Sequence, residues 1–245
     1  MEVTNPPSPI EPEDTAVPWA WLKAANDIIT KPPYKEPSSL PIQLKPWLFL
    51  SDMMSLLNAK KLKDLGITHV LTTNKEEPPA FSPLFNELRS KLEQLDIIHC
   101  AVDGEDVNGY DMLGKHWETC KEFIVQAKRE YGDNAKIVVH CAAGMNRSGL
   151  IAAAAMLTLC DQEEEDEGEK KAQPLQNKDQ MLSHCKQPLQ DEKPTLLNVV
   201  RDLKRKRGMV LLNRSFQKQL CILAAKHGCL GDKPEGYSDS PDSMF

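Results

Sequence analysis

The segment VVHCAAGMNRSG, residues 138–149, contains four residues at fixed spacing whose side chains could bind or react with an anion. They are His140, Cys141, Arg147 and Ser148. An apolar run before it predicts a buried strand that ends at His140, and the apolar run 148–160 predicts a buried helix. Cys141 therefore lies at the tip of the strand. A loop of small residues leads from there to Arg147 and Ser148, which open the helix.

This loop has the features of a phosphate-binding site. Five residues separate the cysteine from the arginine, and they are Ala142, Ala143, Gly144, Met145 and Asn146. Successive small residues let backbone N–H groups turn inward as a nest, and a helix N-terminus adds partial positive charge. Arg147 adds a planar guanidinium that binds oxyanions through two parallel hydrogen bonds. Gly144 fits a point where the backbone takes an unusual angle or approaches the ligand.

Cys141 is the candidate nucleophile. A thiol surrounded by loop amides, a helix terminus and a guanidinium should be held as thiolate at neutral pH. A thiolate that faces a bound phosphate can attack phosphorus. Ser148 can donate a hydrogen bond to the sulfur and ease its later departure. A lone cysteine at the end of a core strand is usually only a small buried hydrophobe, but the fixed offsets to Gly144 and Arg147 favour catalysis here.

The order His140-Cys141, five residues, Arg147-Ser148 resembles the H-C-x5-R-[ST] signature of the cysteine-dependent protein phosphatases. The resemblance covers roughly residues 42–228, apart from one insertion, and points to the dual-specificity phosphatases. Further segments similar to that domain are Lys45–Ser51 and Leu65–Leu71 at its opening, Phe123-Ile124 and Ile137–Cys141 at its centre, and Leu211–Leu220 at its final helix.

The resemblance implies a protein phosphatase that hydrolyses phosphotyrosine and phosphoserine/threonine in two steps. Cys141 would form a phosphocysteine, while Arg147 and the loop amides hold the phosphate oxygens. His140 and Ser148 would support the loop. An aspartate would protonate the leaving oxygen and then help water to hydrolyse the intermediate. The implied partner is a phosphoprotein substrate, and the reaction requires no metal and no cofactor.

The resemblance leaves more than one aspartate open as the general acid. The family places it on the loop before the long helix, where Asp103, Asp106 and Asp111 all lie. Counting back from Phe123, the family spacing best suits Asp106 with one extra residue. Asp103 would need a longer insertion in the same loop. We therefore expect Asp106 to serve, with Asp103 as the alternative.

Strand-like and helix-like segments alternate along the chain, and this order predicts a three-layer α/β fold with a mostly parallel central sheet flanked by helices. The predicted strands are 43–51, 67–73, 97–102 and 135–140. The predicted helices are 56–65, 81–95, 112–131, 148–160, 194–206 and 213–227.

The chain divides into a leader, a catalytic domain and a tail. Residues 1–41 form a Pro-rich leader, in which the Trp-containing stretch 17–30 predicts a helix docked onto the domain or, alternatively, a partner-docking motif. The dual-specificity phosphatase-like domain spans 42–228 and is interrupted by an acidic insertion, 161–193, which we expect to be disordered. Residues 229–245 are expected to form a flexible tail.

Charge is concentrated in the insertion. The stretch 161–169 holds seven acidic residues, which account for the whole formal net charge of −6. This distribution makes a nucleic-acid partner unlikely on charge grounds and suits a basic protein partner for the insertion. The basic run Lys204–Arg207 could be a nuclear signal, but it ends an amphipathic helix, so a solvated basic face is favoured. Arg207-Gly208 stands where the family often has Arg-Pro.

The remaining composition favours the cytoplasm, the nucleus or both. There are seven cysteines, an odd number, without C-x-x-C or zinc-ligand spacing. No apolar stretch is long enough for a membrane span, and the N-terminus lacks the pattern of a signal peptide. Reduced thiols are the expectation in such a chain.

Two other functions stay open. Asn146-Arg147 resembles the G-x-N-R-[ST]-G loop of the RNA 5′-triphosphatase branch of the same superfamily, although residues 142–146 contain no basic side chain to suit a polyanionic RNA end. A non-catalytic phosphoprotein-binding module is the second alternative. The intact Cys141 and Arg147 argue against it.

Overall fold

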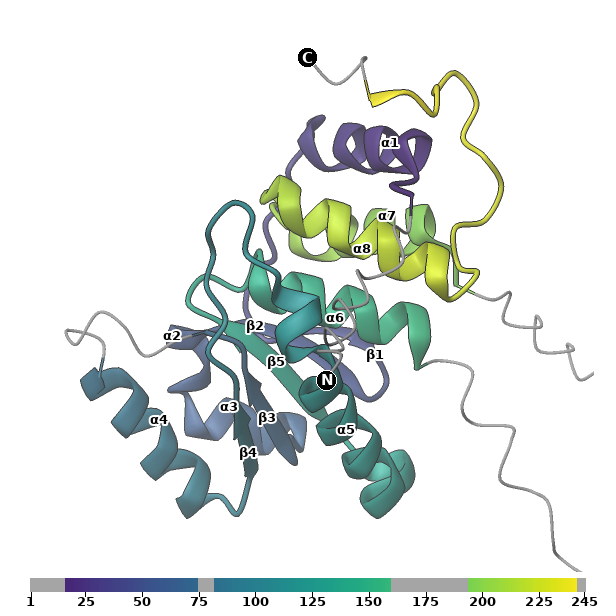
Figure 1. Ribbon diagram of the computed structural model, residues 1–245. Coiled ribbons are helices and arrows are strands. Elements are labelled where there is room, and N and C mark those ends of the chain that lie inside the picture. The colour runs from purple at the N-terminus through teal and green to yellow at the C-terminus, as the bar shows by residue number, and fades with distance from the viewer. Residues whose placement is uncertain (1–15, 75–81, 160–193, 242–245) are drawn as a thin grey trace, which may run out of the picture.

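The computed structural model describes residues 16–74, 82–159 and 194–241, and these residues form one mixed five-stranded sheet covered by helices (Figure 1). The strand order is β1-β2-β5-β3-β4. The strands are β1 (Ile42–Lys45), β2 (Leu48–Asp52), β3 (His69–Thr72), β4 (Ile98–Ala101) and β5 (Ile137–Cys141). Only β1 runs antiparallel to its neighbour, so the predicted α/β class with a mostly parallel sheet is confirmed.

Helices cover both faces of the sheet. They are α1 (Trp19–Thr30), α2 (Met53–Leu56), α3 (Ala59–Leu65), α4 (Ser82–Gln94), α5 (Met112–Tyr131), α6 (Arg147–Thr158), α7 (Leu196–Arg207) and α8 (Arg214–Lys226), with a short 3-10 turn, η2 (Gly132–Asn134), after α5. On one face, α2, α3 and α4 pack against Phe49, Val70 and Val138. On the other, α5 and α6 pack against the alternate residues of the same strands, among them Leu50 and Val139. This alternation is what a strand buried on both faces requires.

Helix α6 is enclosed between the sheet and the pair α7 and α8 (Figure 1). Ten of its twelve residues are buried, which is why the sequence is apolar around the whole helix and shows no amphipathic stripe. The alanines at 152–155 have no side chain beyond Cβ, so neighbouring elements can approach closely. The start of α6, which carries Arg147 and Ser148, is therefore fixed from every side.

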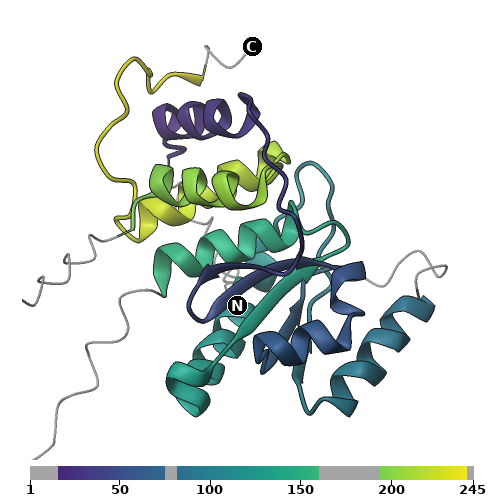
Figure 2. The ribbon, with the colours of Figure 1, turned by 180° about the vertical axis from the view of Figure 1, so that it is seen from behind.

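Helix α1 lies against α7 and α8 as an outer layer, as both views show (Figures 1 and 2). Its buried side chains include Leu22 and Ile29, and the indole N–H of Trp21 donates to the carbonyl oxygen of Leu230 at 3.0 Å. The described part of residues 1–41 thus packs on the domain.

Residues 229–241 differ from the flexible tail that the sequence predicts. Cys229 is buried, and its carbonyl accepts a hydrogen bond from the Leu196 amide at 2.7 Å. Further along, the Tyr237 hydroxyl donates to Asp27 at 2.9 Å, and Lys23 donates to the Ser238 carbonyl at 3.1 Å. The low hydropathy of the segment concealed these contacts because polar groups make most of them.

Two predicted elements are each split into two. Residues 43–51 were expected as one strand, but Pro46 and Trp47 form a turn, so β1 and β2 make an antiparallel hairpin. Residues 56–65 were expected as one helix, but Asn58 caps α3 by accepting a hydrogen bond from the Lys61 amide. Helix α3 ends at Gly66, whose left-handed backbone, φ +68°, is typical of the residue that follows a helix.

The acidic insertion 161–193 lies outside the described residues, so its expected disorder and its basic partner stay predictions. None of the described helices is both long and apolar enough to cross a membrane.

Candidate active site

Cys141 lies at the carboxyl end of β5, the central strand, between β2 and β3. The carboxyl ends of parallel strands are where α/β folds place ligands. The side chain is buried, with 1% exposure, and the Ser148 hydroxyl donates to its Sγ at 3.2 Å. The strand and the first turn of α6 therefore bring the predicted nucleophile and its predicted supporting hydroxyl together.

Gly144 has the unusual backbone angle that the sequence leads one to expect. Its φ is +65°, and a Cβ added there would lie 2.6 Å from the carbonyl oxygen of Ser51. A side chain at this position would be strained and would also collide with β2. The loop can therefore turn back over the sheet edge only with glycine here.

Every carbonyl from Ala142 to Met145 accepts a hydrogen bond from outside the loop. The Met53 amide donates to the Ala142 carbonyl at 3.3 Å, and the Leu211 amide donates to the Met145 carbonyl at 3.1 Å. The guanidinium of Arg207 donates to both carbonyls between them, those of Ala143 and Gly144, at 3.0 Å each. Three separate elements thus hold the loop by its carbonyl side.

Arg207 corrects the expectation of a solvated basic face for residues 204–207. Its side chain is only 8% exposed and forms an ion pair with Glu36 besides the two loop contacts. Glu36 also accepts a hydrogen bond from the Met209 amide at 3.1 Å. A buried cation is stable only when its hydrogen bonds and charge are matched, which these contacts achieve.

Gly208 allows this contact. Its φ is +80°, and an added Cβ would lie 2.8 Å from both the Glu36 carboxylate and the Lys35 carbonyl. Proline, which the family often has here, cannot adopt a positive φ. Glycine in place of the proline that the family often has therefore lets Lys35 and Glu36 pack closely against the end of α7.

Arg147 extends from the start of α6 toward the loop that follows β4. Its Nη1 donates to the Gly104 carbonyl at 3.3 Å. Its Nε is buried and has no hydrogen-bond partner among the described residues. A buried N–H donor of this kind fits an oxyanion ligand, which would supply the missing acceptor.

Two side-chain amides hold the carboxylate of Asp106, and one of them belongs to the loop after Cys141. Asn146 donates to one carboxylate oxygen at 2.9 Å, and Asn213 donates to the other at 3.0 Å. Asn213 is also the N-cap of α8, where its side-chain oxygen accepts from the Ser215 amide at 3.1 Å. The loop that carries Asp106 is thereby held beside the loop after Cys141.

The two other candidate acids have different surroundings. Asp111 caps α5, since its side chain accepts from the Gly114 amide at 2.9 Å. At Asp103, it is the backbone carbonyl that accepts a hydrogen bond, from the Tyr110 hydroxyl at 3.0 Å. Of the three candidate aspartates, Asp106 is the one whose side chain contacts the loop 142–147, through Asn146.

Comparison with known sequences decides the family. Residues 48–162 match the family model described as "Dual specificity phosphatase, catalytic domain", and residues 111–215 match the one described as "Protein-tyrosine phosphatase". The chain belongs to the dual-specificity phosphatase family. In rat, dual specificity protein phosphatase 26 is 33% identical over 116 residues, which are 46% of this chain and 48% of that protein. Its cattle counterpart is 28% identical over 182 residues, 73% of this chain and 64% of that protein.

The chain thus spans about half of the rat relative and less than two thirds of the cattle one. Solved dual-specificity phosphatase structures share the fold. Human DUSP28 aligns with a TM-score of 0.50 and 16% identity, over 78% of this chain and 98% of that chain. OH1 from the Orf virus, described as a tyrosine phosphatase, aligns with a TM-score of 0.50 and 15% identity, over 82% and 92% of the two chains.

In this member of the dual-specificity phosphatase family, His140 supports the loop from inside the sheet. Its Nε2 lies 2.7 Å from the Thr72 hydroxyl, which lies 2.8 Å from Nε2 of His99. Its carbonyl accepts from both the amide and the hydroxyl of Thr73. Desolvation by burial lowers the pKa of His140 to about 3. The ring is therefore neutral throughout the physiological range.

This burial predicts a pH dependence of stability. His140 has its ordinary pKa, near 6.5, in the unfolded chain and a lowered pKa in the fold, so the unfolded chain binds more protons between those values. Its contribution is fully present above about pH 6.5. It falls by about 1.4 kcal/mol per pH unit as pH drops toward the folded pKa. Urea unfolding at several pH values should give a steeper acid loss for the native chain than for His140→Asn. Equal slopes would contradict the neutral buried ring.

Two residues of the site escaped the sequence analysis, Arg207 as a support of the loop and Glu36 as its partner. The signal available was the departure at Arg207-Gly208, which alone does not say where the arginine points. Within the described ranges, no three His, Cys, Asp or Glu side chains gather where they could hold a metal ion.

Proposed function

We propose that this chain hydrolyses phosphate monoesters on tyrosine and on serine or threonine side chains, through a phosphocysteine at Cys141. The observation that carries the proposal is a buried thiol, with the Ser148 hydroxyl 3.2 Å away, at the base of a loop whose carbonyls are all bonded on one side. Membership of the dual-specificity phosphatase family supports the reaction class.

The outward carbonyls support an anion site because of peptide geometry. In a trans peptide the C=O and the following N–H point in opposite directions. Donors from Met53, Arg207 and Leu211 hold the carbonyls of 142–145, so the amides of 143–146 face the other way. Several converging amides at the start of α6 form a nest that suits the oxygens of a phosphoryl group.

The chemistry follows in two balanced steps. The Cys141 thiolate forms an S–P bond as the P–O bond to the substrate side chain breaks, and Asp106 gives its proton to the leaving oxygen. Water then attacks phosphorus, the Asp106 carboxylate takes the proton of that water, and the S–P bond breaks to release phosphate and thiolate. The Arg147 guanidinium and the loop amides stabilise the charge on the phosphoryl oxygens in both steps. Ser148 stabilises the departing thiolate.

The RNA 5′-triphosphatase alternative rested on Asn146. The side-chain nitrogen of Asn146 donates to Asp106, and its side-chain oxygen accepts from the backbone amide of Asn213 at 3.3 Å. An asparagine at this position is therefore accounted for by its role in holding the loop that carries Asp106. Turnover of a phosphotyrosine peptide, a phosphothreonine peptide and a triphosphate-ended RNA should be compared at equal enzyme. We expect both peptides to be turned over faster. Faster turnover of the RNA would overturn the proposal.

The same proposal makes a phosphoprotein the partner of this chain. A non-catalytic binding module would differ from the proposed enzyme because it would bind the peptides without turnover. None of the described cysteines forms a disulfide, which suits the reducing cytoplasm or nucleus.

A further inference from the structure

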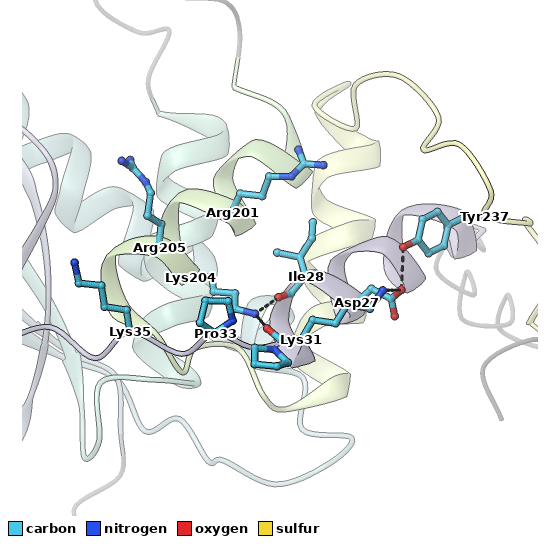
Figure 3. A pocket seen from close by; sticks show the side chains of 10 residues that line it. Asp27, Ile28, Lys31, Pro33, Lys35, Arg201, Lys204, Arg205 and Tyr237 are labelled. Atoms are coloured by element: carbon cyan, nitrogen blue, oxygen red, sulfur yellow. Dashed lines mark hydrogen bonds and ion pairs between the residues drawn. The ribbon is translucent and has the colours of Figure 1, made fainter.

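A basic groove lies between the end of α1 and the outer side of α7. Its volume is about 540 Å³ (Figure 3). Its charged lining residues are Asp27, Lys31, Lys35, Arg201, Lys204 and Arg205. Five of these are cations and one is an acid. The whole chain has the opposite sign, with a formal net charge of −6.

The single acid of the groove is already engaged. Asp27 accepts from Lys31 at 2.7 Å and from the Tyr237 hydroxyl at 2.9 Å, as the dashed lines in Figure 3 show. These contacts lower the pKa of Asp27, with the Lys31 hydrogen bond as the largest cause. Asp27 therefore neutralises Lys31 and leaves the other cations of the groove without a carboxylate.

Three of those cations have no carboxylate partner among the described residues. Lys204 donates to the carbonyls of Ile28 and Lys31 at the end of α1, so its charge is fixed in place but not neutralised. The guanidinium of Arg201 bonds only the side-chain amide of Asn198, at 3.0 Å. Lys35 is exposed and forms no ion pair in the described part of the chain. Arg205, in contrast, pairs with Asp202.

We propose that this groove binds an acidic peptide segment of the phosphoprotein substrate. Its lining offers Ile28, Pro32, Pro33 and the ring of Tyr237 to apolar side chains, while the three uncompensated cations favour carboxylates. A cavity of this size exceeds the needs of a single phosphate. At physiological salt a charge acts over about 8 Å, so a short acidic segment is enough to engage the three cations.

The groove is placed to act together with the catalytic loop. Helix α7 carries Arg201 and Lys204 on the groove side and ends at Arg207, which holds the loop carbonyls. Arg201 stands six positions before Arg207 in the helix, a rise of about 9 Å. Lys35 adjoins Glu36, the ion-pair partner of Arg207. A substrate docked in the groove is thus held beside the site, a role that rests on the proposed function.

The test is binding of a fluorescent, unphosphorylated peptide rich in glutamate with one aromatic residue, measured by anisotropy on the full chain. We expect Lys35→Glu/Arg201→Glu to weaken binding at least tenfold and added salt to weaken binding to the native chain. Lys60→Glu/Lys63→Glu makes the same charge change on α3, across the sheet, and should leave the affinity unchanged. Equal affinity in the groove variant, or equal loss in both variants, would overturn the proposal.

Kinetics separate the docking role from the proposed function. With a phosphopeptide that carries an acidic extension, the groove variant should raise KM at least fivefold and leave kcat and aryl phosphate turnover unchanged. A native chain that binds the acidic peptide but turns over no phosphate would refute the proposed function and leave the groove as a binding site. Tighter binding of a single-stranded RNA, lost in the same variant, would assign the groove to nucleic acid instead.

The chain's own acidic stretch is the remaining competitor. A full-length variant with the seven acids of 161–169 replaced by amides should bind the peptide with unchanged affinity. Peptide binding seen only in that variant would mean that the native chain fills its own groove, which would overturn the assignment to a partner.

Discussion

Cys141→Ser should lower turnover of an aryl phosphate by roughly 1,000-fold or more, which corresponds to about 4 kcal/mol of activation free energy. A serine hydroxyl stays protonated at neutral pH and cannot replace a thiolate as nucleophile. Binding of the oxyanion should survive, because Arg147 and the loop amides do not depend on the sulfur. Steady-state turnover and calorimetric binding of inorganic phosphate would measure the two effects on one preparation.

Cys100→Ser is the matched control, because it makes the same atom change in β4, which β3 separates from the strand of Cys141. Burial raises the pKa of the Cys100 thiol, so this side chain is a protonated thiol at neutral pH. Its replacement should leave turnover within about twofold. If Cys141→Ser kept more than a tenth of the native turnover while folding normally, another nucleophile would have to carry the reaction.

The candidate nucleophile could be proposed from the sequence because all the required information is local. Strand, small-residue loop and helix follow one another within twelve residues, and the position of Gly144 is dictated by the backbone turn that this order requires. The same holds for the layers. Runs buried on both faces differ in pattern from amphipathic helices, so the sheet and its covering helices followed from periodicity alone.

The support of the loop could not be found in this way because its contacts are distant in sequence. Arg207 lies 63 residues from Gly144 and 171 residues from Glu36. Helical periodicity places a residue on a face of α7 but does not say which of four consecutive basic residues turns inward. Polar contacts of this kind depend on which donors and acceptors meet once the elements have packed. The hydropathy pattern of the sequence therefore does not predict them.

The outer layer was underestimated for a related reason. Helix α1 was expected from its apolar rhythm, but the segment 229–241 was not expected to hold it. Tyr237 contacts Asp27 through a single hydroxyl, and Lys23 contacts backbone and side-chain oxygens of Ser238. These two segments stand at opposite ends of the chain, so only the fold itself brings them together.

Asp106→Ala should slow hydrolysis of a phosphotyrosine peptide by about 100-fold, the usual contribution of a positioned general acid. Turnover of p-nitrophenyl phosphate should fall by less than about tenfold, because that leaving group departs without a proton. A phosphothreonine peptide, whose alkoxide is a poorer leaving group, should be affected most. Parallel kcat measurements on the three substrates check this order.

Asp103→Ala provides the control on the same loop, since both carboxylates are exposed and only Asp106 contacts Asn146 and Asn213. Should Asp103→Ala produce the dependence on leaving group and Asp106→Ala not, Asp103 is the acid. The comparison also separates loss of a proton donor from damage to the loop. Releasing Asn146 distorts the phosphate site for every substrate and lowers all three turnovers by a similar factor, whereas loss of the acid spares the substrate that needs no proton.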